Sequence, residues 1–558
     1  MKRLLKIVLP LIGRAGMIKY FLLGILSGMS GFLFIRAVNS VIALVNAGGY
    51  TMISREFIIM FASVILLFVW TRKTLSMTVI RLSQTLFWIL RKQVLALVLN
   101  ANYKQLSERR SQIYAAIVTD VGTLTQASLS VIDFFTSVIL AVTVLIYLAN
   151  MSLVLFGLTA VITTIGILVY HFGSKKNNKS LEGARNLEEG FIKNFNSILT
   201  GFKEIHMEPK KGKQIYDSKI KHIAQESYSH NYTAFSGFLH NQITGQVLFY
   251  ILIAAILLVF SITLGISAAD TISYVFTLMY LLGSIESIMV LLPTLMRAGI
   301  SAKKIMDLKA DLEKAELSNP MPEKYMTKEE FQNISVRGME FNYGNTNTEA
   351  EAEAAFSVGP VDLDIAKGDA IFIYGGNGSG KTTFVQTLIG LYVPTSGEIR
   401  LNGSLITETS YPVYKTIFSV VFSDFYLFEE MVGIDNFDEA KCLRYLEMFE
   451  LGEKVGVENK AFTTTNLSTG QRKRLALIAA LMEEKPVLVL DEWAADQDPY
   501  FRKKFYTEII PMLKADGITI IAITHDDKYY HYADRLYKMD YGKLIEENVN
   551  IHKTIAAV

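Results

Sequence analysis

Residues 370–383 of this 558-residue chain read AIFIYGGNGSGKTT, an apolar run followed by a glycine-rich loop. The loop fits the pattern G-x-x-x-x-G-K-[ST], in which glycines let backbone N–H groups close around phosphate oxygens. A helix that begins directly after the loop adds a favourable dipole for the anion. We therefore expect Lys381 to neutralise the β- and γ-phosphates of a nucleotide, and Thr382 to bind Mg²⁺. The predicted cofactor-binding residues of the loop are Gly375, Asn377, Gly378, Ser379, Gly380, Lys381, Thr382 and Thr383.

A second apolar run, Val487 to Leu490, leads into Asp491 and Glu492, about 110 residues beyond the loop lysine. A buried strand of this kind delivers a carboxylate to a phosphate site. We expect Asp491 to hold the metal, mostly through water, and Glu492 to polarise an attacking water. An apolar strand that ends in Asp-Glu is a weak signal alone. It becomes strong here because another marker directly precedes it.

Long apolar runs are concentrated in roughly the first 300 residues, and charged residues dominate afterwards. Hydrophobic residues make up 51% of the chain and charged residues 19%, a balance too apolar for an ordinary soluble protein. A transmembrane helix needs about 20 mostly apolar residues. Six candidate spans meet this requirement, at 17–46, 56–80, 127–150, 152–172, 242–265 and 270–297.

The connections between these spans differ in charge. Three are short and contain a single basic residue, Arg55, whereas the other two are long and rich in lysine and arginine. Positive residues are retained on the cytoplasmic side, so the long connections and both termini are predicted to be cytoplasmic. Apolar residues recur there at helical spacing, which predicts helices continuing into the cytoplasm with turns near 102–110 and 202–212. The alternative is an amphipathic bundle on the membrane surface.

The sequence divides into two domains joined by a linker at 301–330, where charged, helix-like sequence is followed by SNPMPE. Strand-like and helix-like stretches then alternate, which implies a largely parallel sheet wrapped by helices. We predict an all-α six-helix membrane domain at 1–300 and an α/β P-loop NTPase domain at 331–550. The acidic stretch at 346–355 is predicted to be a solvated loop insertion. The sequence has no basic block interleaved with aromatics that would suggest nucleic acid, and its single cysteine, Cys442, cannot form an internal disulfide.

The marker before the Asp-Glu pair is LSTGQ at 467–471, followed by the basic, helix-forming RKRLALIAALMEE. Here the sequence resembles the ABC transporter family, whose signature has the form LSGGQ, with Thr469 in place of a glycine. The resemblance implies a membrane domain of ABC exporter type and an ATPase that works as a homodimer with two ATP molecules, and Mg²⁺, at its interface. It implies that Ser468 and Gly470 face the γ-phosphate bound by the other subunit, where a second helix N-terminus meets the anion. Gln471 belongs to the same predicted cofactor-binding set.

Three further residues match the family pattern. Tyr343, in MEFNYG, corresponds to the aromatic that stacks on adenine; the alternative is an ordinary strand tyrosine. His525, in AITHDD, lies 33 residues past Glu492 and corresponds to the histidine that contacts the γ-phosphate. Asp498, six residues past Glu492, corresponds to the aspartate that communicates across the dimer. The resemblance thus implies Glu492 and His525 as the catalytic residues.

One position departs from the family. The family has a glutamine at the start of the loop that couples to the membrane domain, whereas this chain has Ser423 within VVFSDFYLF. A serine is shorter, so either it reaches Mg²⁺ through water or Asp424 substitutes for it. The metal set implied by the resemblance is Thr382, Asp491 and Ser423.

The stretch LSTGQRKRLALIAALMEEKPVLVLDEWAADQDPYFRKKFY at 467–506 is similar, more narrowly, to the cyclic-peptide exporter branch. That branch includes exporters of lasso peptides, lipopeptides and siderophore-peptide precursors. The resemblance is strong over 325–545 and mainly topological before it. It implies a multi-pass protein of the bacterial plasma membrane, with membrane lipids around it and a peptide-like cargo. The alternatives are a lipid or lipid-linked-glycan flippase and an ATP-gated regulatory membrane protein without transport.

Polar residues inside the predicted spans are candidates for the cargo site, because ionisable groups there are costly and usually face a polar cavity or each other. Arg36 in the first span and Glu286 in the last are the clearest, and Asn39 adds polar character. Our hypothesis is that they line a central cavity, with Arg36 and Glu286 pairing or contacting a zwitterionic peptide. The alternative is an internal salt bridge that only fixes helix packing.

Overall fold

The structure is a computed structural model in which the chain forms two compact units. The first, here called the helical unit, comprises Met1–Leu99 and Leu106–Lys314, and the second, the sheet unit, comprises Asn100–Gln105 and Ala315–Val558. Tyr343 and the stretch at 346–355 lie outside the described residues, so their predictions stay untested. The structure describes residues 2–46, 55–313, 325–342 and 356–549, without the side chains of most of the first 21 residues.

Long helices make up the helical unit, and six segments of it are long and apolar enough to cross a membrane, as predicted. The 46 residues of α2 extend about 70 Å at 1.5 Å per residue, more than twice the hydrocarbon thickness of a bilayer. The prediction that helices continue beyond the spans is therefore confirmed. The main helices are α1 (Lys2–Asn46), α2 (Arg55–Asn100), α3 (Tyr103–Ala115), α4 (Val121–Met151), α5 (Leu153–Thr200), α8 (Lys221–Ala255) and α10 (Ala268–Glu313).

The two predicted turns are mostly helical. α3 begins at Tyr103, so the first turn is reduced to two residues, and α10 runs to Glu313 through the first part of the predicted linker. In the second turn the Glu208 side chain caps the backbone N–H of Lys210 at 3.3 Å, and Pro209 takes the first helical position. The connection there comprises α6 (Phe202–Met207), α7 (Pro209–Ile215) and the π-helical turn η2 (Tyr216–Ile220).

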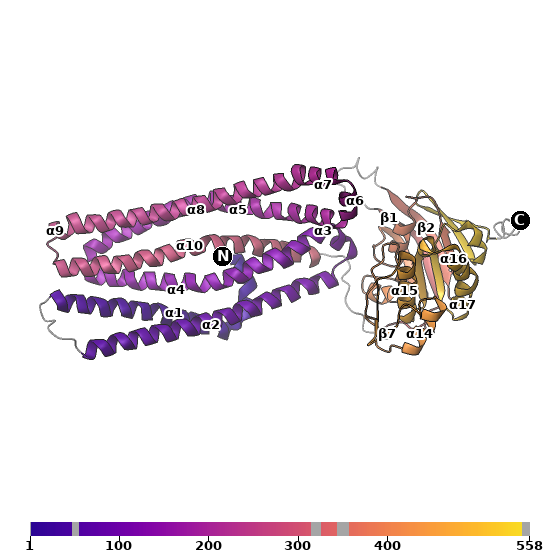
Figure 1. Ribbon diagram of the computed structural model, residues 1–558, viewed down its shortest axis with the longest axis horizontal. Coiled ribbons are helices and arrows are strands. Elements are labelled where there is room, and N and C mark those ends of the chain that lie inside the picture. The colour runs from indigo at the N-terminus through magenta and orange to yellow at the C-terminus, as the bar shows by residue number, and fades with distance from the viewer. Residues whose placement is uncertain (1, 47–54, 314–324, 343–355, 550–558) are drawn as a thin grey trace. The chain divides into compact units, whose positions relative to one another are not determined.

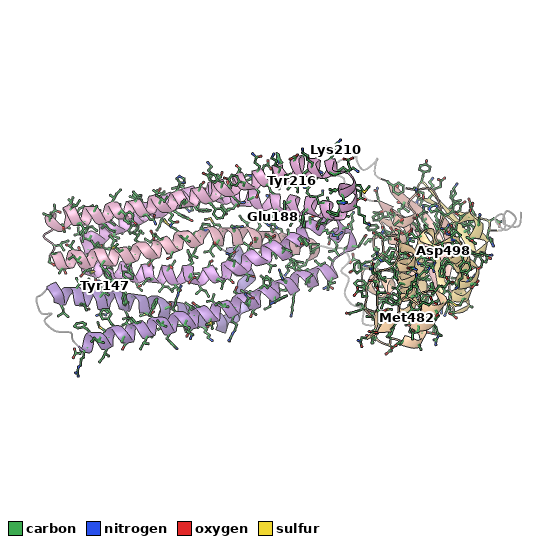
Figure 2. The ribbon with its side chains drawn as sticks, viewed as in Figure 1. Tyr147, Glu188, Lys210, Tyr216, Met482 and Asp498 are labelled. Carbon is green, nitrogen blue, oxygen red and sulfur yellow. The ribbon has the colours of Figure 1, made fainter. Side chains whose placement is uncertain are left out.

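The connecting elements lie at opposite ends of the bundle. Figure 1 shows α6 and α7 at one end, and α9 (Ser261–Thr263), which follows the π-helical turn η3 (Ile256–Phe260), at the other. In Figure 2, Lys210 and Tyr216 project at the first end, whereas Tyr147 lies toward the second. We call the segment 202–220 the tip of the helical unit.

Close packing of α5 against α8 depends on two glycine–asparagine pairs. A Cβ on Gly173 would lie 2.6 Å from the Asn241 amide, and a Cβ on Gly237 would lie 2.2 Å from the Asn177 oxygen. Both distances are far below van der Waals contact, so a larger residue at either glycine would have to displace the facing asparagine side chain. Small residues serve the same purpose in other membrane helix pairs.

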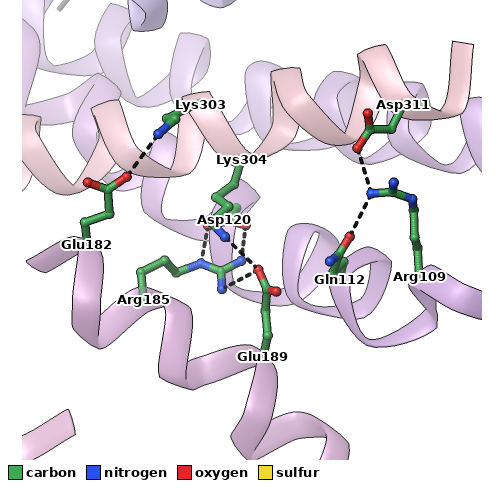
Figure 3. Close-up of polar contacts among 9 residues, drawn as sticks. All are labelled: Arg109, Gln112, Asp120, Glu182, Arg185, Glu189, Lys303, Lys304 and Asp311. Carbon is green, nitrogen blue, oxygen red and sulfur yellow. Dashed lines mark hydrogen bonds and ion pairs between the residues drawn. The ribbon is translucent and has the colours of Figure 1, made fainter. Parts of the chain in front are cut away.

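Beyond the predicted spans, ion pairs join α5 to its neighbours (Figure 3). Arg185 donates to both carboxylate oxygens of Asp120, at 2.8 and 2.5 Å. Asp120 is the last residue of the π-helical turn η1 (Ala116–Asp120), which precedes α4. The Arg185 side chain is 10% exposed and that of Asp120 is 0% exposed. Glu189 lies 3.5 Å from Arg185 and 3.2 Å from Lys304 of α10. The buried Arg185–Asp120 pair therefore joins α5 to η1, and Glu189 joins α5 to α10.

A six-stranded sheet forms the centre of the sheet unit, in the order β12-β11-β3-β10-β9-β6. All neighbours pair in parallel except β11 and β12. The predicted α/β architecture is therefore confirmed. The strands are β3 (Ala370–Tyr374), β6 (Phe418–Val421), β9 (Val487–Asp491), β10 (Thr519–Ile523), β11 (Arg535–Asp540) and β12 (Lys543–Glu547).

A second, antiparallel sheet in the order β2-β1-β4-β5 and several helices complete this unit (Figure 1). Its strands are β1 (Asn333–Asn342), β2 (Ser357–Ala366), β4 (Ser396–Leu401) and β5 (Ser404–Leu405), and β7 (Val457–Glu458) pairs with β8 (Ala461–Phe462). The helices include α12 (Lys381–Leu388), α13 (Tyr411–Lys415), α14 (Glu439–Met448), α15 (Thr469–Met482), α16 (Pro499–Lys504) and α17 (Ile510–Ala515), and the single turns are η4 (Trp493–Asp496), η5 (Phe505–Ile509) and η6 (Asp527–Tyr532).

The central strands are apolar throughout because both faces of the sheet are covered. Phe372 and Leu490 point into one core, whereas Ile373 and Val489, one residue away, point into the other. Cys442 of α14 is buried in the first core, and this burial raises the pKa of its thiol to about 11. The cysteine is therefore a core side chain and is held in its protonated form.

Candidate functional site

The predicted site residues follow strands that are neighbours in the parallel sheet. Ile523 of β10 is in register with Asp491 of β9 on one side and with Ile373 of β3 on the other. The chain therefore leaves these strands at one edge, where the carboxyl ends of a doubly wound sheet form a ligand crevice. The phosphate loop follows β3, Glu492 follows β9, His525 follows β10 and Ser423 follows β6.

The loop at 375–380 has a backbone that only glycine can adopt at two positions. A Cβ on Gly375 would lie 2.2 Å from the carbonyl oxygen of Met539. Gly380 has φ +107° at the residue before α12, and a Cβ there would press on Phe356 and Val358 at 3.0 Å. Ser379 is 8% exposed and its hydroxyl has no hydrogen-bond partner among the described residues. The loop thus offers a buried polar group to a ligand.

Lys381 lies inside this loop. Its ammonium donates to the carbonyl oxygens of Gly375 and Gly376 at 2.9 and 3.0 Å. The residue is 6% exposed, and this burial lowers its pKa, against the raising effect of Glu492 and Asp491. The Lys381 ammonium is therefore well placed to donate further hydrogen bonds to phosphate oxygens.

Asp491 and Glu492 have different surroundings. Asp491 is 2% exposed, and its Oδ1 has no partner among the described residues. Burial, followed by the charge of Glu492, raises its pKa, whereas the hydrogen bond from Ser423 lowers it. A divalent cation would reverse the effect of burial, because it favours the charged carboxylate. The buried, partly unpartnered oxygens of Asp491 therefore fit a metal ligand.

Glu492 has a left-handed backbone, with φ +50° and ψ 36°. Non-glycine residues in this region are uncommon and are concentrated at functional sites. Its amide donates to the carbonyl of Ile523 at 3.1 Å, and its own carbonyl accepts from the buried Lys473 at 2.9 Å. The conformation presents the carboxylate to His525, whose Nε2 lies 3.3 Å from Oε1. The two predicted catalytic residues are thus in contact.

Ser423, the position that departs from the family, donates its hydroxyl hydrogen to Oδ2 of Asp491 at 3.3 Å. The serine therefore lies beside the predicted metal ligand. Sequence could not show this contact, because β6 and β9 are neighbours in the sheet but far apart in the chain. Asp424, the predicted substitute, is exposed, as is Ser423.

We expect Ser423→Ala to raise the Mg²⁺ concentration for half-maximal ATPase activity by about 2- to 10-fold, the effect of losing one hydrogen bond. The measurement is a Mg²⁺ titration of phosphate release at fixed ATP. Ser419→Ala is the matched control, because Ser419 lies on β6, four residues before Ser423, and its hydroxyl donates to Glu483 at 2.9 Å instead. Equal Mg²⁺ requirements in the two variants would remove Ser423 from the metal set.

The signature residues lie at the start of α15. Ser468 caps the helix, and its side chain and that of Gln471 bond to each other's backbone N–H groups at 3.4 Å. Thr469 is the first residue of the helix, where its side chain does not interrupt this cap. Gly470 approaches the next segment closely, since a Cβ there would lie 2.6 Å from the carbonyl oxygen of Asp496. The two hydrogen bonds between Ser468 and Gln471 stay within the signature, so they do not join it to the phosphate loop.

Buried basic residues of α15 connect the signature to Asp498, and sequence reasoning missed them. Arg474 donates to Asp498 at 2.6 Å and to Gln497 at 2.8 Å, and Gln497 in turn donates to the carbonyl of Gly470 at 3.1 Å. Asp498 (Figure 2) also caps α16, and the hydrogen bond from the Phe501 backbone, followed by the charge of Arg474, lowers its pKa. Asp498 is thus held in place by its own subunit.

The candidate cargo residues of the helical unit have different hydrogen-bond partners and surroundings. Asn39 is buried and donates to the hydroxyls of Thr277 at 2.8 Å and Tyr147 at 3.4 Å. Glu286 accepts a hydrogen bond from Gln246. Arg36 is exposed, and no ion pair between it and Glu286 occurs in the described part of the chain. The proposed Arg36–Glu286 pair is therefore not formed within this single chain.

Comparisons with known proteins identify the family of the chain. Residues 358–495 match the family described as ABC transporter. Over 417 residues the chain is 31% identical to the ATP-binding protein SyrD of Pseudomonas syringae pv. syringae, covering 72% of each chain. It is also 33% identical over 193 residues to the spermidine/putrescine import ATP-binding protein PotA of Bacteroides thetaiotaomicron, covering 33% of this chain and 41% of PotA.

The similarity to SyrD is longer than the 244 residues from Ala315 to Val558, so it extends into the helical unit. A solved structure of a bacterial Atm1-family ABC exporter with ATP bound has a similar fold, with a TM-score of 0.79, 16% identity and 98% of each chain covered. The chain therefore belongs to the ABC transporter family, as a half-transporter whose ATPase domain binds ATP and couples its hydrolysis to transport across a membrane.

Proposed function

We propose that this half-transporter exports a cyclic, lasso or otherwise modified peptide, or a peptide siderophore precursor, from the cytoplasm. It would act as a homodimer in the bacterial plasma membrane, with both termini and the ATPase domain cytoplasmic. The observation that carries the proposal is that Glu492, in contact with His525, belongs to the same chain as six candidate spans. A regulatory protein that only senses ATP would not need this catalytic carboxylate. The peptide cargo rests on the resemblance of 467–506 to the cyclic-peptide exporter branch.

The residues of the sheet edge fit MgATP, because Ser379 and Asp491 each hold a buried polar atom that has no hydrogen-bond partner in the described part of the chain. Lys381 and the loop amides would hold the phosphates, and Thr382, Asp491 and Ser423 would hold Mg²⁺. Bound MgATP supplies the phosphoanhydride bond and the cation that neutralises its charge. The Glu492 carboxylate would take a proton from the attacking water, and its 3.3 Å contact with His525 would keep it oriented.

The signature residues would complete the site of a second copy. Ser468, Gly470 and Gln471 stand at a helix N-terminus, which favours an anion. Because one chain carries both the phosphate loop and the signature, two copies would form two equivalent sites. In the proposed cycle, ATP closes the two ATPase domains, the loop tips near 102–110 and 202–212 pass this motion to the spans, and hydrolysis resets the pair. Exposed apolar side chains on the tip, Phe202 (59% exposed) and Met207 (83%), suit such a contact surface.

Comparing cells that express wild type with cells that express Glu492→Gln tests the proposed cargo. Mass spectrometry of the medium and of the cell interior should show a modified peptide that disappears from the medium and accumulates inside the variant cells. If peptides are unchanged while a lipid or lipid-linked glycan redistributes, the cargo proposal is wrong and the flippase alternative replaces it.

Glu286→Gln tests the proposed cargo cavity. Removing a charge that the cargo contacts should reduce export or change the preference among peptides, while basal ATPase activity and protein level stay near wild type. Glu226→Gln is the control, because Glu226 is exposed on α8 and lies 3.7 Å from His222. Unchanged export and unchanged preference in Glu286→Gln would remove this residue from the cavity.

A further inference from the structure

An apolar cavity of about 420 Å³ lies among α4, α5, α8 and α10 of the helical unit. Its walls include Phe134, Ile167, Phe249 and Leu281, one from each helix. Tyr170 also lines it, and the Tyr170 hydroxyl is buried without a hydrogen-bond partner among the described residues. The volume is within the usual range for small-molecule sites. None of the proposed cargo residues, Arg36, Asn39 and Glu286, lines this cavity.

A second cavity, of about 560 Å³, adjoins the first, since both are lined by Ser174, Leu292 and Met296. Its other walls are mixed: Lys175, Asn178 and Glu182 of α5 and Lys303 of α10 are polar or charged, whereas Leu295, Gly299 and Ile300 of α10 are apolar. Together the two cavities form one amphipathic space along α5 and α10, apolar at one end and charged at the other. We call it the α5–α10 cavity.

The depth of the α5–α10 cavity follows from the sequence of α5. The apolar run that begins at Leu153 ends at Phe172, and Lys175, Lys176 and Lys179 follow at once. Basic residues directly after a span mark the cytoplasmic interface. The charged end of the cavity therefore lies at the level of the head groups of the cytoplasmic leaflet, and the apolar end lies in its hydrocarbon.

The charged end favours an anion. Lys303 is paired with Glu182 at 3.1 Å, but both side chains are about 40% exposed, so the pair is weak. Lys175 is exposed and forms no ion pair with any described residue. The two lysines and one glutamate leave a net positive charge at the mouth. Basic pockets between membrane helices on the cytoplasmic side suit anionic lipid head groups.

We propose that the α5–α10 cavity is a binding site for an anionic phospholipid of the cytoplasmic leaflet. One acyl chain occupies the apolar end, between Gly166 of α5 and the side chains of α10, and the phosphate lies beside Lys175 and Lys303. A free phosphate would leave the apolar end unfilled. A zwitterionic lipid such as phosphatidylcholine also brings a cation, so it would leave the net positive charge of the mouth unbalanced. The inference goes beyond peptide export and does not depend on the cargo, but it rests on the proposed orientation, in which the basic connections are cytoplasmic.

Two matched pairs of variants separate the head-group and chain contacts. Lys175→Gln removes a cavity lysine, whereas Lys176→Gln removes its exposed neighbour, which does not line the cavity. Gly166→Leu fills the apolar end, whereas Gly157→Leu adds the same side chain elsewhere on α5. At both glycines a Cβ would meet nothing within 4 Å, so both positions have room for the start of a side chain.

The experiment is native mass spectrometry of the full-length transporter released from nanodiscs containing equal amounts of phosphatidylglycerol and phosphatidylcholine with identical acyl chains. Wild type should retain phosphatidylglycerol preferentially. Lys175→Gln should reduce that preference about fivefold, the effect of one interfacial lysine, and Lys176→Gln should keep it. Gly166→Leu should lose most retained lipid of both kinds, unlike Gly157→Leu.

Several results would overturn the proposal. Equal retention of the two lipids by wild type would show that the cavity has no preference for an anionic lipid. Identical behaviour of the two lysine variants would show that Lys175 does not hold the head group. Competition by free glycerol phosphate would show an anion site without a chain. A peptide-sized adduct in place of phospholipid, in protein from producing cells, would show a cargo site. If no peptide export is found while the lipid results hold, only the proposed function is wrong, because the lipid measurement uses no cargo.

Discussion

Replacing Glu492 with glutamine is expected to lower ATP hydrolysis by about 10²- to 10⁴-fold, the usual contribution of a general base. The amide keeps the size of the side chain and its contact with His525 but cannot accept the proton of the attacking water. ATP binding should persist, because Lys381 and the loop amides are unchanged. Phosphate release measures hydrolysis, and a fluorescent ATP analogue measures binding.

Glu508→Gln is the control for this change, because Glu508 is an exposed residue of η5 and should leave turnover near wild type. His525→Ala offers a second comparison, since it removes the partner that orients Glu492 without removing the base. We expect hydrolysis in His525→Ala to fall as well. Robust turnover in Glu492→Gln would contradict the role assigned to this carboxylate.

Asp120→Asn is expected to destabilise the helical unit substantially. The change leaves Arg185, whose side chain is 10% exposed, without its main counter-charge. Breaking a buried pair by removing one partner costs about 3–5 kcal/mol. Glu189, 3.5 Å from Arg185, offsets part of this loss, so the lower end of that range is expected. The midpoint of thermal unfolding of the purified transporter in detergent measures the effect.

A more exposed pair between α3 and α10 provides the control. Arg109 and Asp311 lie 2.6 Å apart, but their side chains are 33% and 35% exposed, so Asp311→Asn should cost at most about 1 kcal/mol. The double variant Asp120→Asn, Arg185→Met should recover part of the lost stability, because it removes the unpaired charge as well. Equal unfolding midpoints for Asp120→Asn and Asp311→Asn would show that burial does not strengthen the first pair.

Local sequence predicted the features that depend on local chemistry. The apolar runs that became β3 and β9 are buried on both faces, so their composition alone indicates a covered parallel sheet. Glycines in the phosphate loop are required by the backbone itself, as the 2.2 Å approach of a Cβ on Gly375 to Met539 shows. Long apolar helices with basic ends likewise predicted the six candidate spans.

Contacts between distant parts of the chain were not predictable in the same way. Ser423 reaches Asp491 because β6 and β9 are neighbours in the sheet, and no local pattern contains that order. Glu286 bonds to Gln246 of α8 rather than to Arg36, and this choice depends on helix packing.

One missed feature did leave a signal in the sequence. Arg474 lies on the same helical stripe as Leu477, Ile478 and Leu481, at the spacing of a buried face. A basic residue on such a stripe indicates a buried partner, which is Asp498 in the structure. The composition of RKRLALIAALMEE indicates only a basic helix, whereas the burial of Arg474 depends on its position on the apolar face of that helix.

The state of Cys442 has a practical consequence for spectroscopy. Its thiol is fully buried and its pKa is raised to about 11, so almost none of it is thiolate at neutral pH. Maleimide and nitroxide reagents, which react with the thiolate, should therefore leave the folded protein unlabelled. A cysteine introduced at an exposed position such as Lys210 would then be the one reactive thiol of each chain. In a homodimer, two such labels would report the separation of the two tips through the ATP cycle, without prior removal of the native cysteine.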